Sequence, residues 1–126
     1  MVDVVLFVDD DEDLRDAMQE VLGKLGVQRV ITAGSLRDVE QLRSEVLECQ
    51  LAVLDINLGR DEPSGIQVYE WLTSAGFAGR VVFLTGHASN DPRVQQAASL
   101  SHSKIASKPL SIAELRDLLA GASAPP

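Results

Sequence analysis

The chain has 126 residues, of which 45% are hydrophobic and 24% charged, so its size and composition fit one globular domain. Its net charge of −8 argues against sequence-independent nucleic-acid binding, which needs clustered Lys and Arg to replace phosphate counterions. With no apolar run near the roughly 20 residues that span a bilayer, no signal-peptide pattern and one cysteine, Cys49, we expect a cytoplasmic protein without membrane contact.

The first half of the chain alternates apolar runs with stretches of helical period. Residues 4–8 are Val, Leu and Phe without polar alternation, which is typical of a parallel strand buried on both faces. A helix follows, with apolar positions 14, 18, 21, 22 and 25 on one side and Gly26 ending it. A weaker strand at 29–32 precedes a second helix, which Ser35 caps and whose apolar positions are 36, 39, 42 and 46.

The second half repeats this alternation. A buried strand at 51–54 is followed by a helix over 65–75, and a third strong strand spans 81–84. A weaker helix starts near Asn90, with Pro92 in its first turn. After a weak strand at 104–106, Ser111 and Glu114 have the spacing of a capping box for a last helix with apolar positions 112, 115, 118 and 119. Residues 121–126 resemble a frayed end.

Five strands alternating with five helices predict an α/β fold with right-handed crossovers and helices on both faces of a parallel sheet. For five such units we expect the flavodoxin-like strand order 2-1-3-4-5. Its functional crevice lies at the carboxyl ends of strands 1 and 3, where the winding reverses. We expect one domain over residues 1–121, with residues 122–126 as a flexible tail or the start of a linker.

Polar residues follow four of the predicted strands at the point where each strand ends. Because the carboxyl ends of parallel strands lie at one edge of a sheet, residues up to a hundred positions apart are expected to form one site. A single acidic residue after a strand is common. It is much less probable by chance that a carboxylate cluster, a hydroxyl and a lysine all follow apolar strands. These residues are Asp9 and Asp10, Asp55, Thr85 and Lys108.

The three carboxylates of Asp9, Asp10 and Asp55 would repel one another in close quarters unless a cation lay between them. Oxygen ligands suit Mg²⁺ or Ca²⁺, and few protein ligands with room for water favour Mg²⁺. We assign Asp11 and Asp13 instead to the N-cap and first turn of the first helix. A nucleotide or flavin phosphate site would need a glycine-rich loop after the first strand, and acidic residues stand there.

Four segments of the chain resemble the signature segments of response-regulator receiver domains of two-component signalling, in the same order and at nearly the same spacing. The resemblance covers the chain from about Val4 to Leu119. The segments are VVLFVDDD at 4–11, LAVLDINL at 51–58, VFLTG at 82–86 and KPL at 108–110.

The resemblance implies that Asp55 accepts a phosphoryl group from the phosphohistidine of a sensor histidine kinase or a histidine phosphotransfer protein. The domain would then be a switch and no enzyme beyond its own phosphorylation and dephosphorylation. It would act on an output protein that the sequence does not identify, without contacting nucleic acid itself. Homodimerisation on phosphorylation is left open.

The resemblance also implies roles for the other site residues. Asp10 and Asp55 would ligate Mg²⁺ directly, Asp9 would do so through water, and Asn57 would contribute its backbone carbonyl. Lys108 would neutralise charge on the phosphoryl oxygens. Thr85 would bind a phosphoryl oxygen once it is present and draw its loop inward.

The sequence departs from the family pattern in three places. Ile105 stands where many receivers carry a Tyr or Phe that acts as a rotameric switch. The loop at 59–65 lacks the usual Met-Pro pair, and residues 99–103 lack the usual Gly-Ala turn. Isoleucine is stiff at χ1 and has no polar tip. We therefore hypothesise that phosphorylation moves the loop after Thr85 and the helix that follows it, without a side-chain switch in strand 5.

Two other functions use part of the same pattern. A phosphatase of the haloacid-dehalogenase type also uses Asp, Lys and Mg²⁺, but 126 residues leave no room for its cap domain. A pseudo-receiver would be an interaction module with a relic site, yet every functional position here holds a competent residue.

Overall fold

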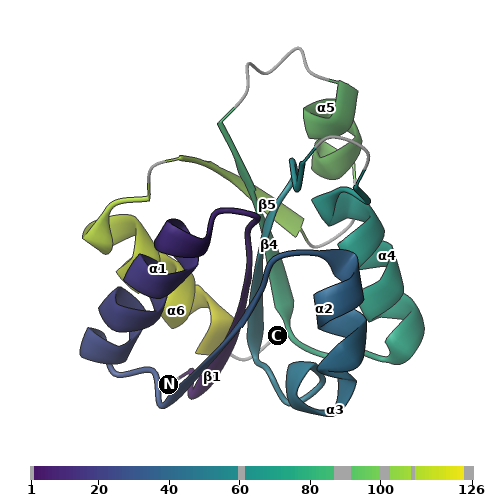
Figure 1. Cartoon of the computed structure of the whole chain (residues 1–126). Helices are drawn as coiled ribbons and strands as arrows, with labels where there is room; N and C mark the ends of the chain where they lie inside the picture. The colour runs from purple at the N-terminus through teal and green to yellow at the C-terminus, as the bar shows by residue number, and fades with distance from the viewer. Residues whose placement is uncertain (1, 60–61, 87–91, 100–102, 109, 124–126) are drawn as a thin grey trace.

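The computed structural model describes residues 2–59, 62–86, 92–99, 103–108 and 110–123, in which strand and helix alternate along the chain (Figure 1). The predicted strands are all present, and four of them are longer than expected by one residue at one or both ends. The elements are β1 (Val4–Val8), α1 (Glu12–Lys24), β2 (Arg29–Ala33), α2 (Leu36–Gln41), α3 (Arg43–Val46), β3 (Leu51–Asp55), α4 (Gly65–Ala75), β4 (Arg80–Thr85), α5 (Pro92–Ala98), β5 (Ser103–Ser107) and α6 (Ile112–Ser123).

The five strands form one parallel sheet in the order β2-β1-β3-β4-β5, as predicted. β1 lies between β2 and β3, with Val5 beside Val30 on one side and Leu51 on the other. The chain therefore winds in one direction from β1 to β2 and in the other from β3 to β5. The crevice that results lies beyond the carboxyl ends of β1 and β3.

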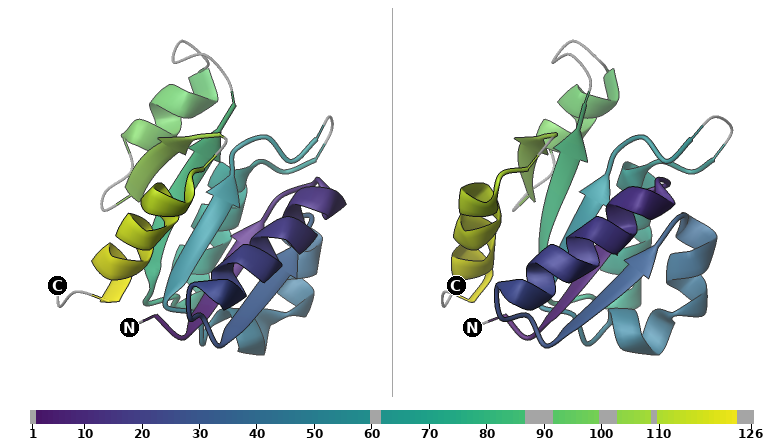
Figure 2. Two further views of the ribbon diagram at one scale, coloured as in Figure 1. Left: turned by 90° about the vertical axis from the view of Figure 1, so that its left-hand side faces the viewer. Right: turned by 60° about the vertical axis from the view of Figure 1, so that its left-hand side comes forward.

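Helices cover both faces of the sheet (Figure 2), and an apolar core lies between the sheet and the helices on each face. Successive residues of β1 alternate between them, because side chains of a strand point to opposite faces in turn. Val5 and Phe7 pack with residues of α1 and α6, whereas Leu6 and Val8 pack with residues of α2, α3 and α4. Both faces are covered, which explains the continuous apolar runs of the inner strands.

Local side-chain caps fix where several helices begin. The Asp11 carboxylate accepts hydrogen bonds from the backbone N–H groups of Asp13 and Leu14, at 3.0 and 3.3 Å, and so starts α1 as expected. Ser111 and Glu114 form the predicted reciprocal capping box of α6. Ser64 and Gln67 form another at the start of α4, which the sequence analysis did not identify.

The structure differs from the sequence prediction in three helices. The single helix expected after Ser35 is divided into α2 and α3 at Leu42, whose φ of −99° and ψ of 21° leave the helical range, although Val39 and Val46 remain buried on one face. Ile112, the first residue of α6, is 55% exposed instead of facing inward, whereas Leu115 and Leu118 of the same predicted stripe are buried. α6 itself continues to Ser123, beyond Gly121, and residues 124–126 of the expected tail lie outside the described residues.

Cys49 is buried with its thiol near the backbone oxygen of Glu45. Burial raises the pKa of this thiol to about 12, so Cys49 is an inert core residue. Tyr69 and Trp71 are partly buried and pack against the core. No described helix has both the length and the apolarity to cross a membrane.

Candidate functional site

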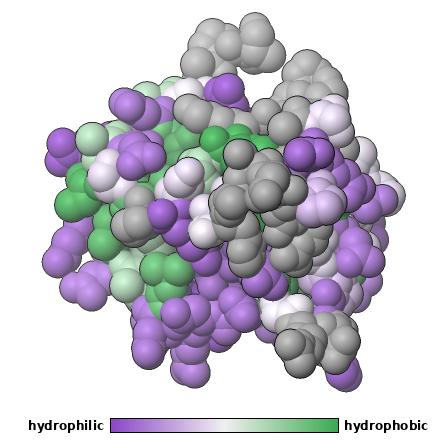
Figure 3. All heavy atoms as spheres, turned by 90° about the horizontal axis from the view of Figure 1, so that it is seen from above, coloured by the Kyte–Doolittle hydropathy of each residue, from purple (hydrophilic) through white to green (hydrophobic). Residues whose placement is uncertain are grey.

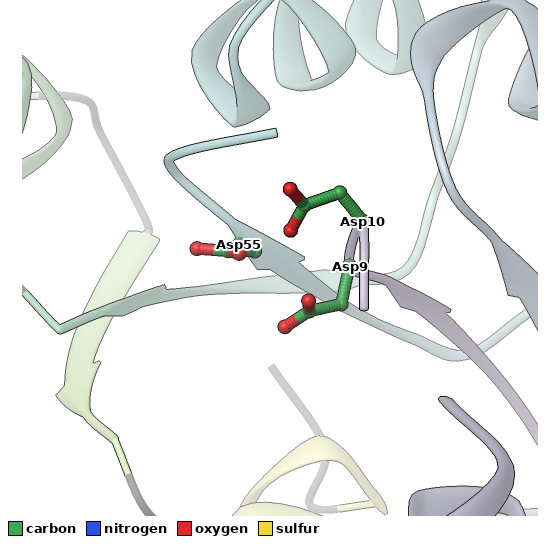
Figure 4. Close-up of side chains that lie close together, drawn as sticks. All are labelled: Asp9, Asp10 and Asp55. Carbon is green, nitrogen blue, oxygen red and sulfur yellow. The ribbon is translucent and has the colours of Figure 1, made fainter. Parts of the chain in front are cut away.

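The carboxyl edge of the sheet brings the predicted site residues together. Asp9 and Asp10 follow β1, while Asp55 and Thr85 are the last residues of β3 and β4, and Lys108 follows β5. One carboxylate oxygen from each of Asp9, Asp10 and Asp55 lies within 4.8 Å of the others. Figure 4 shows these three side chains gathered beyond the ends of β1 and β3.

Asp55 is buried, and both oxygens of its carboxylate have partners. Oδ2 lies 2.9 Å from Lys108 Nζ, and Oδ1 accepts a 3.2 Å hydrogen bond from the backbone N–H of Asn57. Burial raises the pKa of this carboxyl to about 6, with a further increase from the Asp9 charge, and Lys108 opposes both effects. Asp55 is thus a carboxylate that is costly to keep charged without a nearby cation.

Asp9 is fully buried, and it faces the same lysine. Its Oδ2 lies 2.7 Å from Lys108 Nζ as an ion pair, but no described group makes a hydrogen bond to this oxygen. A buried carboxylate oxygen that lacks hydrogen bonds is expensive unless a cation compensates it. Asp10, in contrast, is exposed.

These donors fit Mg²⁺. The ion prefers a few carboxylate or carbonyl oxygens and retains several waters, and the exposed side of Asp10 leaves space for water. Asp9 Oδ2 has an ion pair with Lys108 but no hydrogen bond from a described group, so it retains a lone pair that a water molecule on the ion would satisfy. The observed lysine contacts supply only one positive charge against three carboxylates that lie close together.

Lys108 joins the two buried aspartates to the end of β4. Burial alone would lower the pKa of its ammonium, but the carboxylates of Asp9 and Asp55 outweigh that effect and raise the pKa above its ordinary value. Its backbone N–H donates to the oxygen of Thr85 at 3.0 Å, which fixes the distance between β4 and β5 at their ends. The Thr85 side chain is buried at the same edge.

Glycine is required where α4 meets the candidate acceptor. A Cβ atom on Gly65 would lie 2.2 Å from the backbone oxygen of Asp55, far inside contact distance. The N–H of Gly65 donates to Ile56 O at 2.9 Å, so the start of α4 rests directly on the chain at Asp55. The sequence analysis took this glycine only as the end of a loop. Because an isolated glycine before a helix has many causes, its spacing from Asp55 was the only available signal.

Arg15 is another residue at this edge that the sequence did not single out. It lies on α1 and its Nη1 donates a 2.7 Å hydrogen bond to the backbone oxygen of Asp9. Its position as the single basic residue among the acidic residues from Asp9 to Asp16 was a signal, although a weak one. His87, His102 and Pro109 lie outside the described residues.

Seen from above, onto the carboxyl ends of the strands, hydrophilic residues gather on the side of the molecule where α1 and α2 lie (Figure 3). Asp10, Asp11, Glu12 and Asp13, which lead from β1 into α1, are all exposed. The rim of the site on this side is therefore acidic.

Comparison with known protein families agrees with the resemblance of the four sequence segments. The family model described as the response regulator receiver domain matches residues 5–120. No curated protein sequence matches the chain.

Solved structures of similar fold include a CheY-like receiver domain from Methylobacillus flagellatus, at 19% identity and TM-score 0.76, with 98% of this chain and 100% of that chain covered. The Vibrio cholerae chemotaxis protein CheY4 is similar at 19% identity and TM-score 0.76, with 97% and 99% covered. A receiver domain protein from Clostridium thermocellum has 18% identity and TM-score 0.80, with 95% and 93% covered. At this level of identity, the likenesses establish the fold.

Proposed function

Because this chain belongs to the family of response regulator receiver domains, we propose that it is a phosphoacceptor switch in which Asp55 receives a phosphoryl group. The observation that carries the proposal is the contact geometry at Asp55. Oδ2 of this buried carboxylate lies 2.9 Å from Lys108 Nζ. One oxygen of the carboxylate also lies within 4.8 Å of a carboxylate oxygen of Asp9 and one of Asp10. The site thus combines a nucleophile with a fixed cation and two further metal ligands.

The donor in this proposal is a phosphohistidine of a sensor histidine kinase or a histidine phosphotransfer protein. A carboxylate oxygen of Asp55 attacks the phosphorus atom, so that a P–O bond forms and the P–N bond breaks. The electron pair of the P–N bond stays on the ring nitrogen, and the ring, protonated on its other nitrogen, leaves as neutral imidazole. The product is an aspartyl phosphate that water hydrolyses later.

A Mg²⁺ ion bound by Asp10, Asp55 and the backbone carbonyl of Asn57, with Asp9 acting through water, would neutralise charge on the phosphoryl oxygens. Lys108 would supply a second positive charge, and its contacts with Asp9 and Asp55 already hold it in place. Because both buried carboxylates hold the ammonium, little reorganisation is needed when the phosphoryl group arrives.

Thr85 reports the modification in this account. Its hydroxyl binds a phosphoryl oxygen and stabilises the conformation in which that contact forms, which is the differential contact that a population shift requires. The backbone bond from Lys108 N to Thr85 O couples this event to the end of β5. We assign the protein to the cytoplasm, with a kinase or phosphotransfer protein upstream and an output protein downstream.

Intact-mass measurement after incubation with Mg²⁺ and phosphoramidate tests the proposal. We expect one phosphoryl adduct that is labile to base and absent in Asp55→Asn. An adduct that persists in Asp55→Asn would contradict the proposed acceptor. Steady hydrolysis of phosphate monoesters without a stable adduct would favour a phosphatase of the haloacid-dehalogenase type.

A further inference from the structure

Arg15 makes a contact for which the proposed phosphoacceptor chemistry has no direct use. Its side chain, partly buried on the first turns of α1, reaches back to the end of β1, where Nη1 donates to the backbone oxygen of Asp9 at 2.7 Å. A short hydrogen bond from a guanidinium is about twice as strong as one between neutral groups. This bond holds the peptide that joins Asp9 to Asp10.

The polar groups of Asp9 all have defined neighbours. Its N–H donates to Ala33 O at 3.0 Å, and its Oδ1 accepts from the N–H of Asp11 at 2.9 Å. Its Oδ2 faces Lys108, and its backbone oxygen accepts from Arg15. The hydrogen bond from Arg15 fixes the orientation of the Asp9 carbonyl. Because this carbonyl belongs to the peptide between Asp9 and Asp10, its orientation also determines the position of the Asp10 backbone.

The loop after β2 leaves space for the guanidinium. A Cβ atom on Gly34 would lie 2.9 Å from Arg15 Nη1 and 3.4 Å from Asp38 Oδ2. The N–H of Gly34 donates to that same Asp38 oxygen at 3.0 Å, which holds the loop at this distance. The absence of a side chain at position 34 thus permits Arg15 to reach Asp9.

We propose that Arg15 is a positioning residue for the metal site, which orients the peptide between Asp9 and Asp10 and thereby sets the affinity of the site for Mg²⁺. This inference rests on the proposed function, because it concerns the metal that the proposed acceptor site holds. Residues that orient metal ligands typically change metal affinity 10- to 100-fold when they are replaced.

The sign of the effect separates positioning from simple electrostatics. Arg15 is a cation near a cation-binding cluster, so its charge alone opposes Mg²⁺ binding. If charge were its whole contribution, removing it would tighten Mg²⁺ binding. If Arg15 positions the Asp9–Asp10 peptide, removing it weakens binding despite the loss of repulsion.

The test is a Mg²⁺ titration at 25 °C that follows the backbone amide signals of Asp55 and Asn57 in wild type and variants. Arg15→Met keeps length and helix propensity but removes the donor. Arg43→Met is the matched control, because Arg43 is exposed on α3 and its loss changes the net charge equally. Gly34→Ala displaces the guanidinium without any change in charge, and Arg15→Lys keeps the charge with a shorter reach.

We expect the Kd for Mg²⁺ to rise about tenfold in Arg15→Met and severalfold in Gly34→Ala. Arg15→Lys should lie between Arg15→Met and wild type, and Arg43→Met should stay within about twofold of wild type. Unchanged or tighter binding in Arg15→Met overturns the proposal, and so does unchanged binding in Gly34→Ala if Arg15→Met fails to fold. If wild type itself shows no Mg²⁺ response, the proposed metal site falls with it.

Discussion

Burial distinguishes Asp55 and Asp9 from the acidic residues that follow Asp9 in the chain. Asp10 to Asp13 are exposed and solvated, whereas Asp55 lies at the end of the innermost strand with a lysine as its counter-ion. Residues with charges that are costly to bury are typical of functional sites, because a ligand or a reaction relieves the cost. The fold thus holds three carboxylates close to a single lysine ammonium, which leaves the candidate site with excess negative charge.

This imbalance gives metal-free protein a defined pH dependence. The pKa of Asp55 rises from 3.8 to about 6 on folding, mainly through burial. A raised carboxyl pKa contributes stability that is full below about pH 3.8 and is lost as pH rises through about 6. Asp55→Asn should therefore match wild type near pH 4 in EDTA and be more stable near pH 7. Thermal melts at both pH values check this, and a difference that is constant across the range would contradict it.

Lys108 and Thr85 should separate phosphoryl transfer from its readout. Lys108→Ala removes the ammonium that meets Asp55 and should slow phosphorylation by phosphoramidate about a hundredfold. Thr85→Ala should accept the phosphoryl group at a rate near that of wild type but lose most of the conformational response in amide spectra. Loss of phosphorylation in Thr85→Ala, together with normal phosphorylation and response in Lys108→Ala, would reverse the assigned roles.

The helix α4 begins directly against the backbone of the proposed acceptor. Its first residue, Gly65, rests on the backbone of Asp55, and Ser64 caps the helix there. A helix start that approaches a strand end this closely fixes the backbone that carries the nucleophile. It also makes position 65 intolerant of any side chain.

Gly65→Ala should therefore destabilise the protein by about 1–3 kcal/mol, because the added methyl group cannot avoid backbone atoms. Gly23→Ala is the matched control, since a Cβ atom at this exposed position of α1 would meet nothing within 4 Å. It should raise stability by up to about 1 kcal/mol through helix propensity. Urea unfolding of both variants measures the two effects. Equal effects at the two positions would mean that the close contact at Asp55 relaxes at little cost.

The sequence predicts the elements well where apolar residues are continuous or periodic. It predicts them less well where contacts with the rest of the fold determine a helix break or the exposure of a side chain. The strands β1, β3 and β4 and the helix α4 follow from continuous or periodic apolar residues. The break at Leu42 could not be predicted, because the apolar stripe continues through it and only the backbone angles change. Ile112 was placed inward by its spacing, yet as the first residue of α6 it is exposed.

Ile105, at the usual place of an aromatic switch, is half-buried against the core in β5. Its side chain has no polar tip to move between buried and exposed positions. The hypothesis that the signal passes through the segment after Thr85 and α5 instead stays a prediction.

For the whole molecule, the sequence located the site through topology. Asp9, Asp55, Thr85 and Lys108 are distant in sequence, but parallel strands bring their carboxyl ends to one edge. The sequence did not predict the contacts of Arg15 with the backbone of Asp9 and of Gly65 with the backbone of Asp55. Those contacts depend on the angle at which α1 and α4 meet the sheet, and no local pattern encodes that angle.

We expect the stability of the protein to depend on Mg²⁺, because three carboxylates lie close together in a molecule of net charge −8. Mg²⁺ at 100 times its Kd should stabilise the fold by roughly 2.7 kcal/mol through mass action. Asp10→Ala should lose most of this gain, because it removes an exposed ligand while leaving the buried core unchanged. Thermal melts with Mg²⁺ and with EDTA measure both, and an equal gain in Asp10→Ala would place the ion elsewhere.

The central claim is that Asp55 is the phosphoacceptor, and chemical trapping of the modified residue tests it most directly. Borohydride reduces an aspartyl phosphate to homoserine, whose position peptide mass spectrometry identifies. After incubation with Mg²⁺ and phosphoramidate, we predict homoserine at position 55. Homoserine at position 9 or 10 in its place, or none at all under conditions in which the protein is folded and binds Mg²⁺, would contradict the account.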